Sequence, residues 1–231
     1  MNSKQLNLYK TKTGNYWLPN PNADRVLIDI VNDRVFDEEI VKVAIENLKF
    51  GDNVLDIGSN FGQMAVLFSR AVGAGKVISF EADPWIFSVL QKNIAENNCR
   101  NVLSYHYAVW DKTGETLIYP EADFTVFDSW GSFGINPKAS EGQKVKSIKI
   151  DDLPLPRPIK LIKIDIQGAD LNALKGAKNT ILQDKPVILF EYEHLFDGMF
   201  DTTWKDYEDF FKEINYTMEM ISFNNYKAVS K

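Results

Sequence analysis

The sequence predicts a doubly wound α/β domain built on a mostly parallel sheet. Strand-like runs near residues 53–58, 76–81 and 101–109 alternate with helical patterns, and the alternation resumes with "IKLIKID", a helical stretch and "PVILFEYE". The glycine turn "VLDIGSNFG" follows the first of these strands. Strands that alternate with helices are typical of βαβ units, and a glycine turn after the first strand is a ligand-binding position in such sheets.

The length and composition fit one globular domain. The chain has 231 residues, of which 45% are hydrophobic and 25% charged, close to an ordinary soluble protein. We expect residues 1–36 to form an N-terminal β extension of this domain, because "QLNLYK", "NYWLP" and "RVLIDIVND" resemble short extended segments separated by turn residues. Residues 37–231 are expected to form the main domain.

The main domain has a regular order of expected elements. The helix "DEEIVKVAIENL" comes first, and the strands and helices that follow are "NVLDIG", "FGQMAVLFSRAV", "KVISFE", "DPWIFSVLQKNIAENN" and "NVLSYHYAV". Pro84 suits the first turn of its helix. After "IKLIKID" we expect the helix "ADLNALKGAKNTIL", the strand "PVILFEYE", a helix in "TTWKDYEDFFKEI" and the closing strands "YTMEMIS" and "NYKAVS".

Residues 110–150 interrupt this order. We expect an inserted loop near 120–145, followed by the alternating strand "KVKSIKI". Within the insertion, residues 129–141 combine Trp130 and Phe133 with two glycines. Such a loop beside a ligand site is a candidate for a mobile lid or for a wall of the acceptor site.

Charge and cysteine content exclude several classes of protein. Lys and Arg number 26 against 32 Asp and Glu, so the net charge is −6 and no basic stripe suggests a nucleic-acid partner. Cys99 is the single cysteine, which rules out an internal disulfide. The chain shows no apolar run near the roughly 20 residues of a membrane span and no signal-peptide core, so we expect a cytoplasmic protein.

The turn "VLDIGSNFG" indicates a nucleoside site. Gly58 and Gly62 permit close backbone approach, and the helix that follows offers free N–H groups. The pattern lacks the middle glycine of a dinucleotide fingerprint, which favours a nucleoside without a pyrophosphate. Glu81 ends the next strand, about 20 residues further on, where a carboxylate can accept both hydroxyls of a ribose.

Taken together, "VLDIGSNFG", "VISFEADP", "NVLSYHYAVWDKTGE", "LIKIDIQGADLNALKGA" and "PVILFEYEH" resemble the FkbM-like family of S-adenosylmethionine-dependent methyltransferases, over about residues 50–195. The resemblance implies a Rossmann-like class I methyltransferase fold, with a seven-stranded, mostly parallel sheet whose last strand is antiparallel. It also implies O-methylation of a hydroxyl on a saccharide, glycolipid or small natural product. On this basis S-adenosylmethionine would be held by Asp56, Gly58, Ser59, Asn60, Gly62, Glu81, Ala82, Ala108 and Val109.

Charged residues at the ends of two neighbouring expected strands are the catalytic candidates. Lys163 and Asp165 share one face of their strand, because side chains alternate with period two. Glu191 and His194 come at the end of the next strand, and open α/β sheets bind ligands at this carboxyl edge. Lys163 would favour the ionised form of Asp165.

Two mechanisms remain open at this point. Asp165 or His194 takes the hydroxyl proton directly, or Asp165 and Glu191 hold a divalent cation such as Mg²⁺ that acidifies the hydroxyl. The family has Glu where this chain has Gln167, so we assign neither a base nor a metal ligand to that position.

Three alternative functions compete with this hypothesis. They are a dinucleotide-dependent oxidoreductase, an RNA ribose methyltransferase, which Lys163, Asp165 and Glu191 loosely suggest, and a cofactor-binding protein without turnover. The missing middle glycine counts against the first, and the acidic balance counts against the second.

Overall fold

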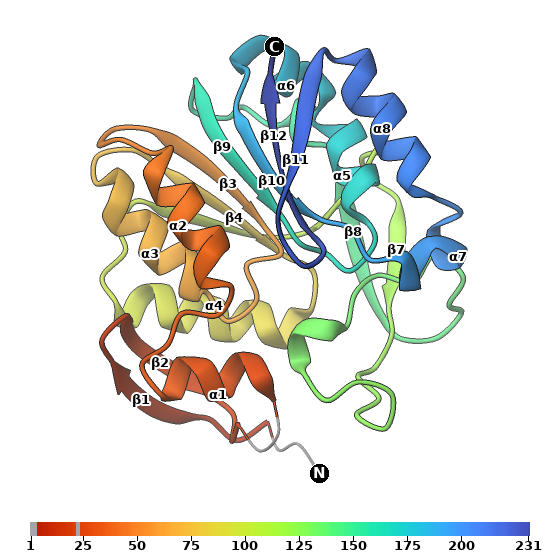
Figure 1. The fold of residues 1–231 in the computed structure, drawn as a ribbon. Coiled ribbons are helices and arrows are strands. Elements are labelled where there is room, and N and C mark those ends of the chain that lie inside the picture. Colours follow the sequence, from red (N-terminus) through yellow and green to blue (C-terminus); the bar gives the residue numbers. More distant parts are fainter. Residues whose placement is uncertain (1–3, 22–23) are drawn as a thin grey trace.

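The computed structural model describes residues 4–21 and 24–231 and contains three sheets in that part of the chain (Figure 1). The central sheet has seven strands in the order β11-β12-β10-β9-β3-β4-β5. Its strands are β3 (Asn53–Ile57), β4 (Val77–Glu81), β5 (Val102–His106), β9 (Ile159–Ile164), β10 (Val187–Glu191), β11 (Tyr216–Ser222) and β12 (Asn225–Ser230). The smaller sheets are the hairpin of β1 (Asn7–Thr11) and β2 (Gly14–Leu18), and the sheet β6-β8-β7, from β6 (Ala108–Val109), β7 (Thr116–Tyr119) and β8 (Gln143–Ile148).

The strand directions confirm the predicted fold class. Strands β5, β4, β3, β9 and β10 run parallel to one another, whereas β12 is antiparallel to both β10 and β11. The expected strand "NVLSYHYAV" divides at Tyr107 into β5 and the short β6, which leaves the central sheet and pairs with β8. The chain therefore builds a seven-stranded sheet in which the last strand runs against the rest.

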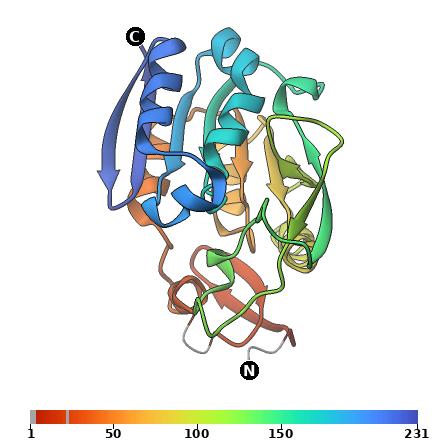
Figure 2. The same cartoon turned by 90° about the vertical axis from the view of Figure 1, so that its right-hand side faces the viewer.

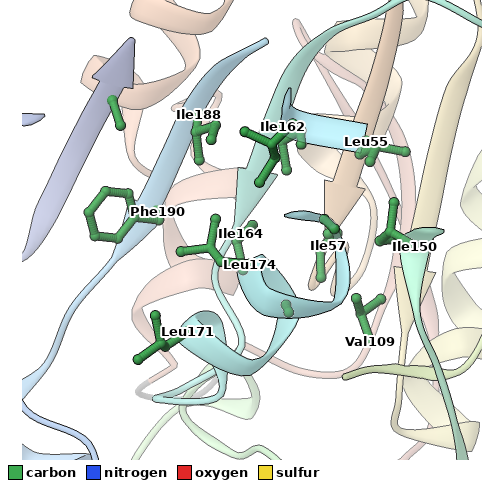
Figure 3. Packing of buried hydrophobic residues seen from close by; sticks show 14 of the residues in the cluster. Leu55, Ile57, Val109, Ile150, Ile162, Ile164, Leu171, Leu174, Ile188 and Phe190 are labelled. Atoms are coloured by element: carbon green, nitrogen blue, oxygen red, sulfur yellow. The ribbon is translucent and has the colours of Figure 1, made fainter. Parts of the chain in front are cut away.

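Helices cover both faces of the central sheet. One face packs on α5 (Asp170–Gly176), α6 (Lys178–Asp184) and α8 (Trp204–Glu213), where Leu55, Ile162 and Phe190 are among the buried residues (Figure 3). The other face packs on α2 (Glu38–Glu46) and α3 (Gln63–Val72) through residues such as Val54 and Leu161. Burial on both faces is the reason why these strands are almost continuously apolar.

The remaining helices are short or lie at the edges. They are α1 (Arg25–Val31), α4 (Pro84–Glu96), α7 (Asp197–Phe200) and the 3₁₀ turns η1 (Trp130–Ser132), η2 (Ile150–Asp152) and η3 (His194–Phe196). Pro84 starts α4, as predicted. The single helix expected over "ADLNALKGAKNTIL" is instead two helices that meet at Ala177, next to Gly176, where an added Cβ would lie 2.0 Å from the Trp110 carbonyl oxygen.

The N-terminal region is only partly a β extension. Its first two extended segments form the β1–β2 hairpin, but the expected strand "RVLIDIVND" was wrong, because this segment forms helix α1. The Asp24 carboxylate caps α1 by accepting the Leu27 N–H at 2.9 Å, and Leu27 and Ile30 bury one helical face. The hairpin and α1 lie together at one end of the molecule (Figures 1 and 2).

Buried side chains tie this end to the rest of the domain. The Asn93 side chain accepts the Trp17 N–H at 2.6 Å and donates to the Phe61 carbonyl oxygen at 2.8 Å. The Asp24 carboxylate also accepts the Trp130 N–H at 2.7 Å. The middle of the inserted loop is therefore anchored to the cap of α1, beside which it lies in both views (Figures 1 and 2).

Membrane spans were searched for in residues 4–21 and 24–231. None of the helices described there combines the length and the apolar character needed to cross a bilayer.

Candidate active site

The turn between β3 and α3 is pressed against the end of β9. Gly58 has φ +82°, and a Cβ added there would lie 1.9 Å from the Asp165 carbonyl oxygen. Gly62 has φ +92° and immediately precedes α3, where an added Cβ would lie 2.7 Å from Leu90. Only glycine combines this backbone conformation with such close approach. The turn therefore places the start of α3 beside the ligand edge of β9.

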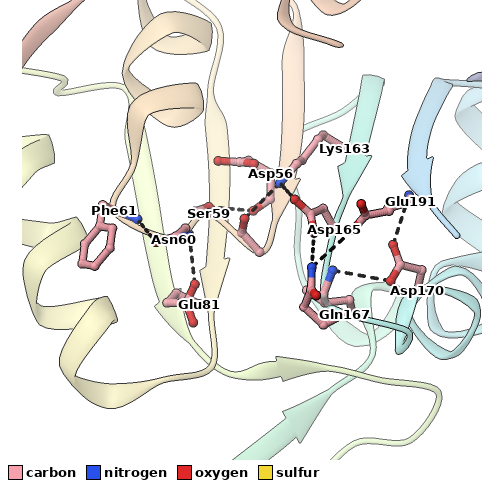
Figure 4. A network of polar contacts seen from close by, with 12 residues as sticks. Asp56, Ser59, Asn60, Phe61, Glu81, Lys163, Asp165, Gln167, Asp170 and Glu191 are labelled. Carbon is pink, nitrogen blue, oxygen red and sulfur yellow. Dashed lines mark hydrogen bonds and ion pairs between the residues drawn. The ribbon is translucent and has the colours of Figure 1, made fainter. Parts of the chain in front are cut away.

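The Glu81 carboxylate faces the same turn from the end of β4. Its two oxygens accept the N–H groups of Asn60 and Asp83, each at 2.9 Å (Figure 4). Burial raises the pKa of Glu81 to about 7, although both of these hydrogen bonds lower it. A carboxylate has about four acceptor positions, so these two hydrogen bonds leave acceptor capacity for a ligand.

Lys163 is a buried cation at the centre of the polar network in Figure 4. Its Nζ donates to the Gly58 carbonyl oxygen at 3.0 Å and lies 3.4 Å from Asp165 Oδ2. Burial alone would lower the pKa of Lys163, but the charges of Asp165, Asp56 and Asp37 outweigh it and raise that pKa. Lys163 therefore stays charged and holds Asp165 against the glycine turn.

Gln167 stands between the two candidate carboxylates. The residue has φ +55°, and its Nε2 donates to Asp165 Oδ1 at 3.1 Å and to Glu191 Oε2 at 3.2 Å. Burial and then the neighbouring charge of Asp165 raise the pKa of Glu191. The amide thus bridges two groups that repel each other when both are ionised.

Asp170 connects the segments that carry Asp165 and Glu191. Its carboxylate is completely buried and accepts the N–H groups of Ile166 and Glu191, both at 3.4 Å. Burial raises its pKa to about 7. Asp170 therefore joins the end of β9 to the end of β10 without facing the cavity described next.

These residues surround one cavity of about 750 Å³. It extends from Gly58 and Glu81 to Asp165 and Glu191, and it is lined by all of the residues that the sequence predicted for the site except two, Asp56 and His194. A volume of this size lies within the range of small-molecule sites.

The two exceptions have different causes. Asp56 pairs with Lys163 in the β3–β9 register, but its side chain is fully buried and its oxygens have no hydrogen-bond partner among the described residues. His194 was expected to converge with Glu191, and this was wrong: its side chain is 88% exposed and pairs with Asp197. The chain turns outward into η3 directly after β10, which carries His194 away from the cavity.

Asp37 is a cavity residue that sequence reasoning missed. It precedes α2 with φ +51°, and burial, followed by the charge of Asp165, raises its pKa to about 6. The Gln63 side chain positions this segment by donating to the Arg34 carbonyl oxygen and accepting the Phe36 N–H. No local sequence pattern signals this long-range placement.

The inserted loop supplies a further wall that was only partly anticipated. Residues 128–135 line the cavity, with Gly131 close to the Asn60 side chain and Gly134 close to Gln167. Trp130 is buried and its ring packs against those of Trp85 and Phe124. The structure thus places this loop along the cavity, while its expected role as a wall of the acceptor site or as a mobile lid stays a prediction.

Metal ligation finds little support in the geometry. In the part of the chain that the structure describes, no group of three or more His, Cys, Asp or Glu side chains is arranged to hold a metal ion. The Gln167 Nε2, a hydrogen-bond donor, occupies the bridging position between Asp165 and Glu191.

A seven-stranded sheet with this strand order, carrying a glycine turn after β3 and an acidic residue at the end of β4, defines a Rossmann-like methyltransferase fold. Residues 56–218 match the methyltransferase FkbM domain, and the chain belongs to that family. The predicted resemblance to this family is thereby confirmed.

Individual relatives are distant. The hexuronic acid methyltransferase AglP of Haloferax volcanii is 25% identical over 63% of this chain and 58% of its own length. Methyltransferase 1 of Beauveria bassiana is 22% identical over 67% of this chain and 69% of its own. A solved structure of a methyltransferase FkbM from Methylobacillus flagellatus superposes with a TM-score of 0.53 at 18% identity, covering 78% of this chain and 43% of that one. The chain therefore spans little more than half of the archaeal relative and less than half of the bacterial structure.

Proposed function

We propose that this protein is an S-adenosylmethionine-dependent O-methyltransferase that acts on a hydroxyl of a saccharide, a glycolipid or a small natural product. One observation carries the proposal: a single cavity joins the glycine turn and Glu81 to the buried Lys163, Asp165 and Glu191. A nucleoside cofactor and an acceptor hydroxyl would thus meet in one cavity.

The residues at the end of the cavity that holds the glycine turn and Glu81 fit S-adenosylmethionine. The Glu81 carboxylate keeps free acceptor positions for the two ribose hydroxyls. The glycine turn offers an uncrowded backbone for the methionine part, and Ala108 and Val109 line the wall expected beside the adenine. This assignment rests on the donor and acceptor pattern and on the family, with Ser59, Asn60 and Ala82 as the adjoining wall.

When bound, the cofactor would supply an electrophilic methyl group. The protein side chains would then have to orient and deprotonate the acceptor hydroxyl. Asp165 is the proposed base, because Lys163 and Gln167 fix its two oxygens from opposite sides. Glu191 has a raised pKa, so it is suited to hold a proton and to hydrogen-bond the acceptor. A positioned base contributes about 10² to 10⁴ in rate.

Direct proton transfer is favoured over the divalent cation considered from sequence. A cation that bridges Asp165 and Glu191 would have to displace the Gln167 amide, which already donates to both carboxylates. A metal route predicts that EDTA abolishes turnover, whereas direct transfer predicts turnover that is independent of EDTA.

The choice of a saccharide hydroxyl is supported by a relative. The Haloferax volcanii protein is named for methylation of a hexuronic acid. An RNA acceptor fits less well, because acidic side chains outnumber basic ones along the cavity. Membership of a methyltransferase family counts against the oxidoreductase alternative.

A thermal shift with S-adenosylmethionine and S-adenosylhomocysteine tests the proposal. At about 100 times Kd, a ligand adds about 2.7 kcal/mol, which for a chain of this size raises Tm by roughly 5 to 10 °C. NAD serves as the control ligand and should produce no shift. Absence of a shift with both nucleosides would refute the cofactor assignment.

A further inference from the structure

The charge around Asp165 bears on the acceptor, provided that the proposed function holds. Three further carboxylates line the cavity close enough to Asp165 to feel its charge: Asp37, Glu191 and Glu193. They come from three separate segments, the start of α2, the end of β10 and the turn after β10. An acceptor that approaches Asp165 must therefore pass between acidic groups.

The cations of the cavity do not offset this charge. Among the described residues, Arg25, Arg34 and Lys163 are the basic residues that line it. Lys163 is buried and engaged by Asp165 and Gly58, and Arg34 pairs with Asp29 at 2.6 Å. Arg25 is exposed at the rim and is already an electrostatic neighbour of Asp37. Among the described residues that line the cavity, Lys163 is the buried cation and it is already paired, so none is left to receive an acceptor carboxylate.

The β11–β12 turn adds an aromatic surface at the mouth. Phe223 lines the cavity and is 85% exposed, the highest value among the large hydrophobic residues of the described chain. Asn224 and Asn225 line the cavity beside it, and the Asn224 carbonyl oxygen accepts the Tyr192 N–H at 2.9 Å, which fixes the turn to the end of β10. An aromatic face with its negative quadrupole attracts the C–H face of a sugar ring, while amides and carboxylates bind its hydroxyls.

We infer that the methyl acceptor is an uncharged sugar ring, stacked on Phe223 and directed to Asp165 between Asp37 and Glu193, and that a uronate is rejected. The hydroxyls of such a ring donate to the surrounding carboxylates without adding charge. A carboxylate on the acceptor would instead meet the like charges of Asp165, Asp37 and Glu193, which is an efficient way to exclude a competing substrate. This chain would then differ in acceptor from its relative named for a hexuronic acid.

A glycan array with radiolabelled S-adenosylmethionine tests whether the protein methylates neutral sugars in preference to uronates. It should carry neutral hexosides, the matched hexuronosides and aminohexosides on the same linker. We expect label on neutral glycans and at least about 10-fold less on their uronate counterparts. Preferential labelling of uronates overturns the inference, as does the absence of labelled neutral glycans from a protein that binds the cofactor. Failure to bind the cofactor at all would refute the proposed function itself.

Two variants test the roles of Phe223 and Glu193 in acceptor binding. Phe223→Ala should raise KM for the labelled neutral glycan about 10-fold or more and leave the dissociation constant of S-adenosylmethionine unchanged. Glu193→Lys should narrow the discrimination against the matched uronate. An unchanged KM in Phe223→Ala together with unchanged discrimination in Glu193→Lys would contradict the inference. Met220→Ala, at an exposed residue of the same hairpin outside the cavity lining, is the matched control for the first variant.

Discussion

At the level of single residues, the site contains several carboxylates, and the contacts of each one determine the role it can take. Lys163 and Gln167 fix Asp165, the backbone N–H groups of Asn60 and Asp83 fix Glu81, and Asp170 joins two strand ends. Similar residue types thus serve as the proposed base (Asp165), the proposed ribose acceptor (Glu81) and a structural tie (Asp170). The neighbours decide which role each can take.

Substitution of Asp165 tests the base at this scale. Asp165→Asn keeps the shape and should lower kcat by about 10² to 10⁴, because the acceptor hydroxyl loses its proton acceptor. Formation of S-adenosylhomocysteine gives kcat, and calorimetry should show cofactor affinity within a few-fold of the wild type. His194→Asn is the control, since His194 is exposed and pairs with Asp197. Equal loss in both variants, or full activity in Asp165→Asn, would contradict the assignment.

Sequence identified most of these residues but not their surroundings. The alternation of "LIKID" correctly placed Lys163 and Asp165 together, since strand geometry is local. The position of His194 was wrong, because three residues after a strand the chain can turn in any direction. Asp37 was missed for the related reason that its contact with the site is made through α3 and not through nearby sequence.

At the element scale, the close approach of the β3–α3 turn to β9 is the feature that assembles the cavity. Sequence predicted both elements, and the glycines marked the turn. It also predicted a strand where α1 forms, because the β-branched residues Val26, Ile28, Ile30 and Val31 favour strands. The Asp24 cap and the burial of Leu27 with Ile30 override that local preference.

Gly58→Ala tests the close contact between the β3–α3 turn and β9, and Gly114→Ala is its matched control. Gly58 and Gly114 have φ of +82° and +88°, but an added Cβ meets the Asp165 carbonyl oxygen at 1.9 Å at the first and no atom within 4 Å at the second. Both variants suffer backbone strain of about 1 to 3 kcal/mol. Gly58→Ala should lose at least about 2 kcal/mol more free energy of unfolding, measured in urea, because of the clash. Equal losses would show that the turn is not in close contact with β9.

At the scale of the whole molecule, buried carboxylates couple stability to pH. Burial raises the pKa of Asp37 to about 6 and the pKa values of Glu81 and Asp170 to about 7, whereas in the unfolded chain these groups titrate near 4. Between pH 4 and 7 the folded state therefore binds more protons than the unfolded state. Stability from these groups is fully present below about pH 4 and is lost as pH rises through 6 to 7.

The urea midpoint of the ligand-free protein should accordingly be higher at pH 5.5 than at pH 8, by an amount equivalent to more than about 1 kcal/mol. Glu81→Gln should shrink the difference, because the amide does not titrate. A midpoint that rises between pH 5.5 and pH 8 would contradict this account of the buried carboxylates.

Calorimetric titration of the cofactor tests whether the cavity binds S-adenosylmethionine through Glu81, as we propose. The wild type should bind at pH 8, where Glu81 is ionised, and Glu81→Gln should bind at least about 10-fold more weakly through the loss of charge-assisted hydrogen bonds to the ribose. Glu193→Gln, a control at the acceptor end, should bind the cofactor like the wild type. No binding by the wild type, or equal affinity in Glu81→Gln, would contradict the account.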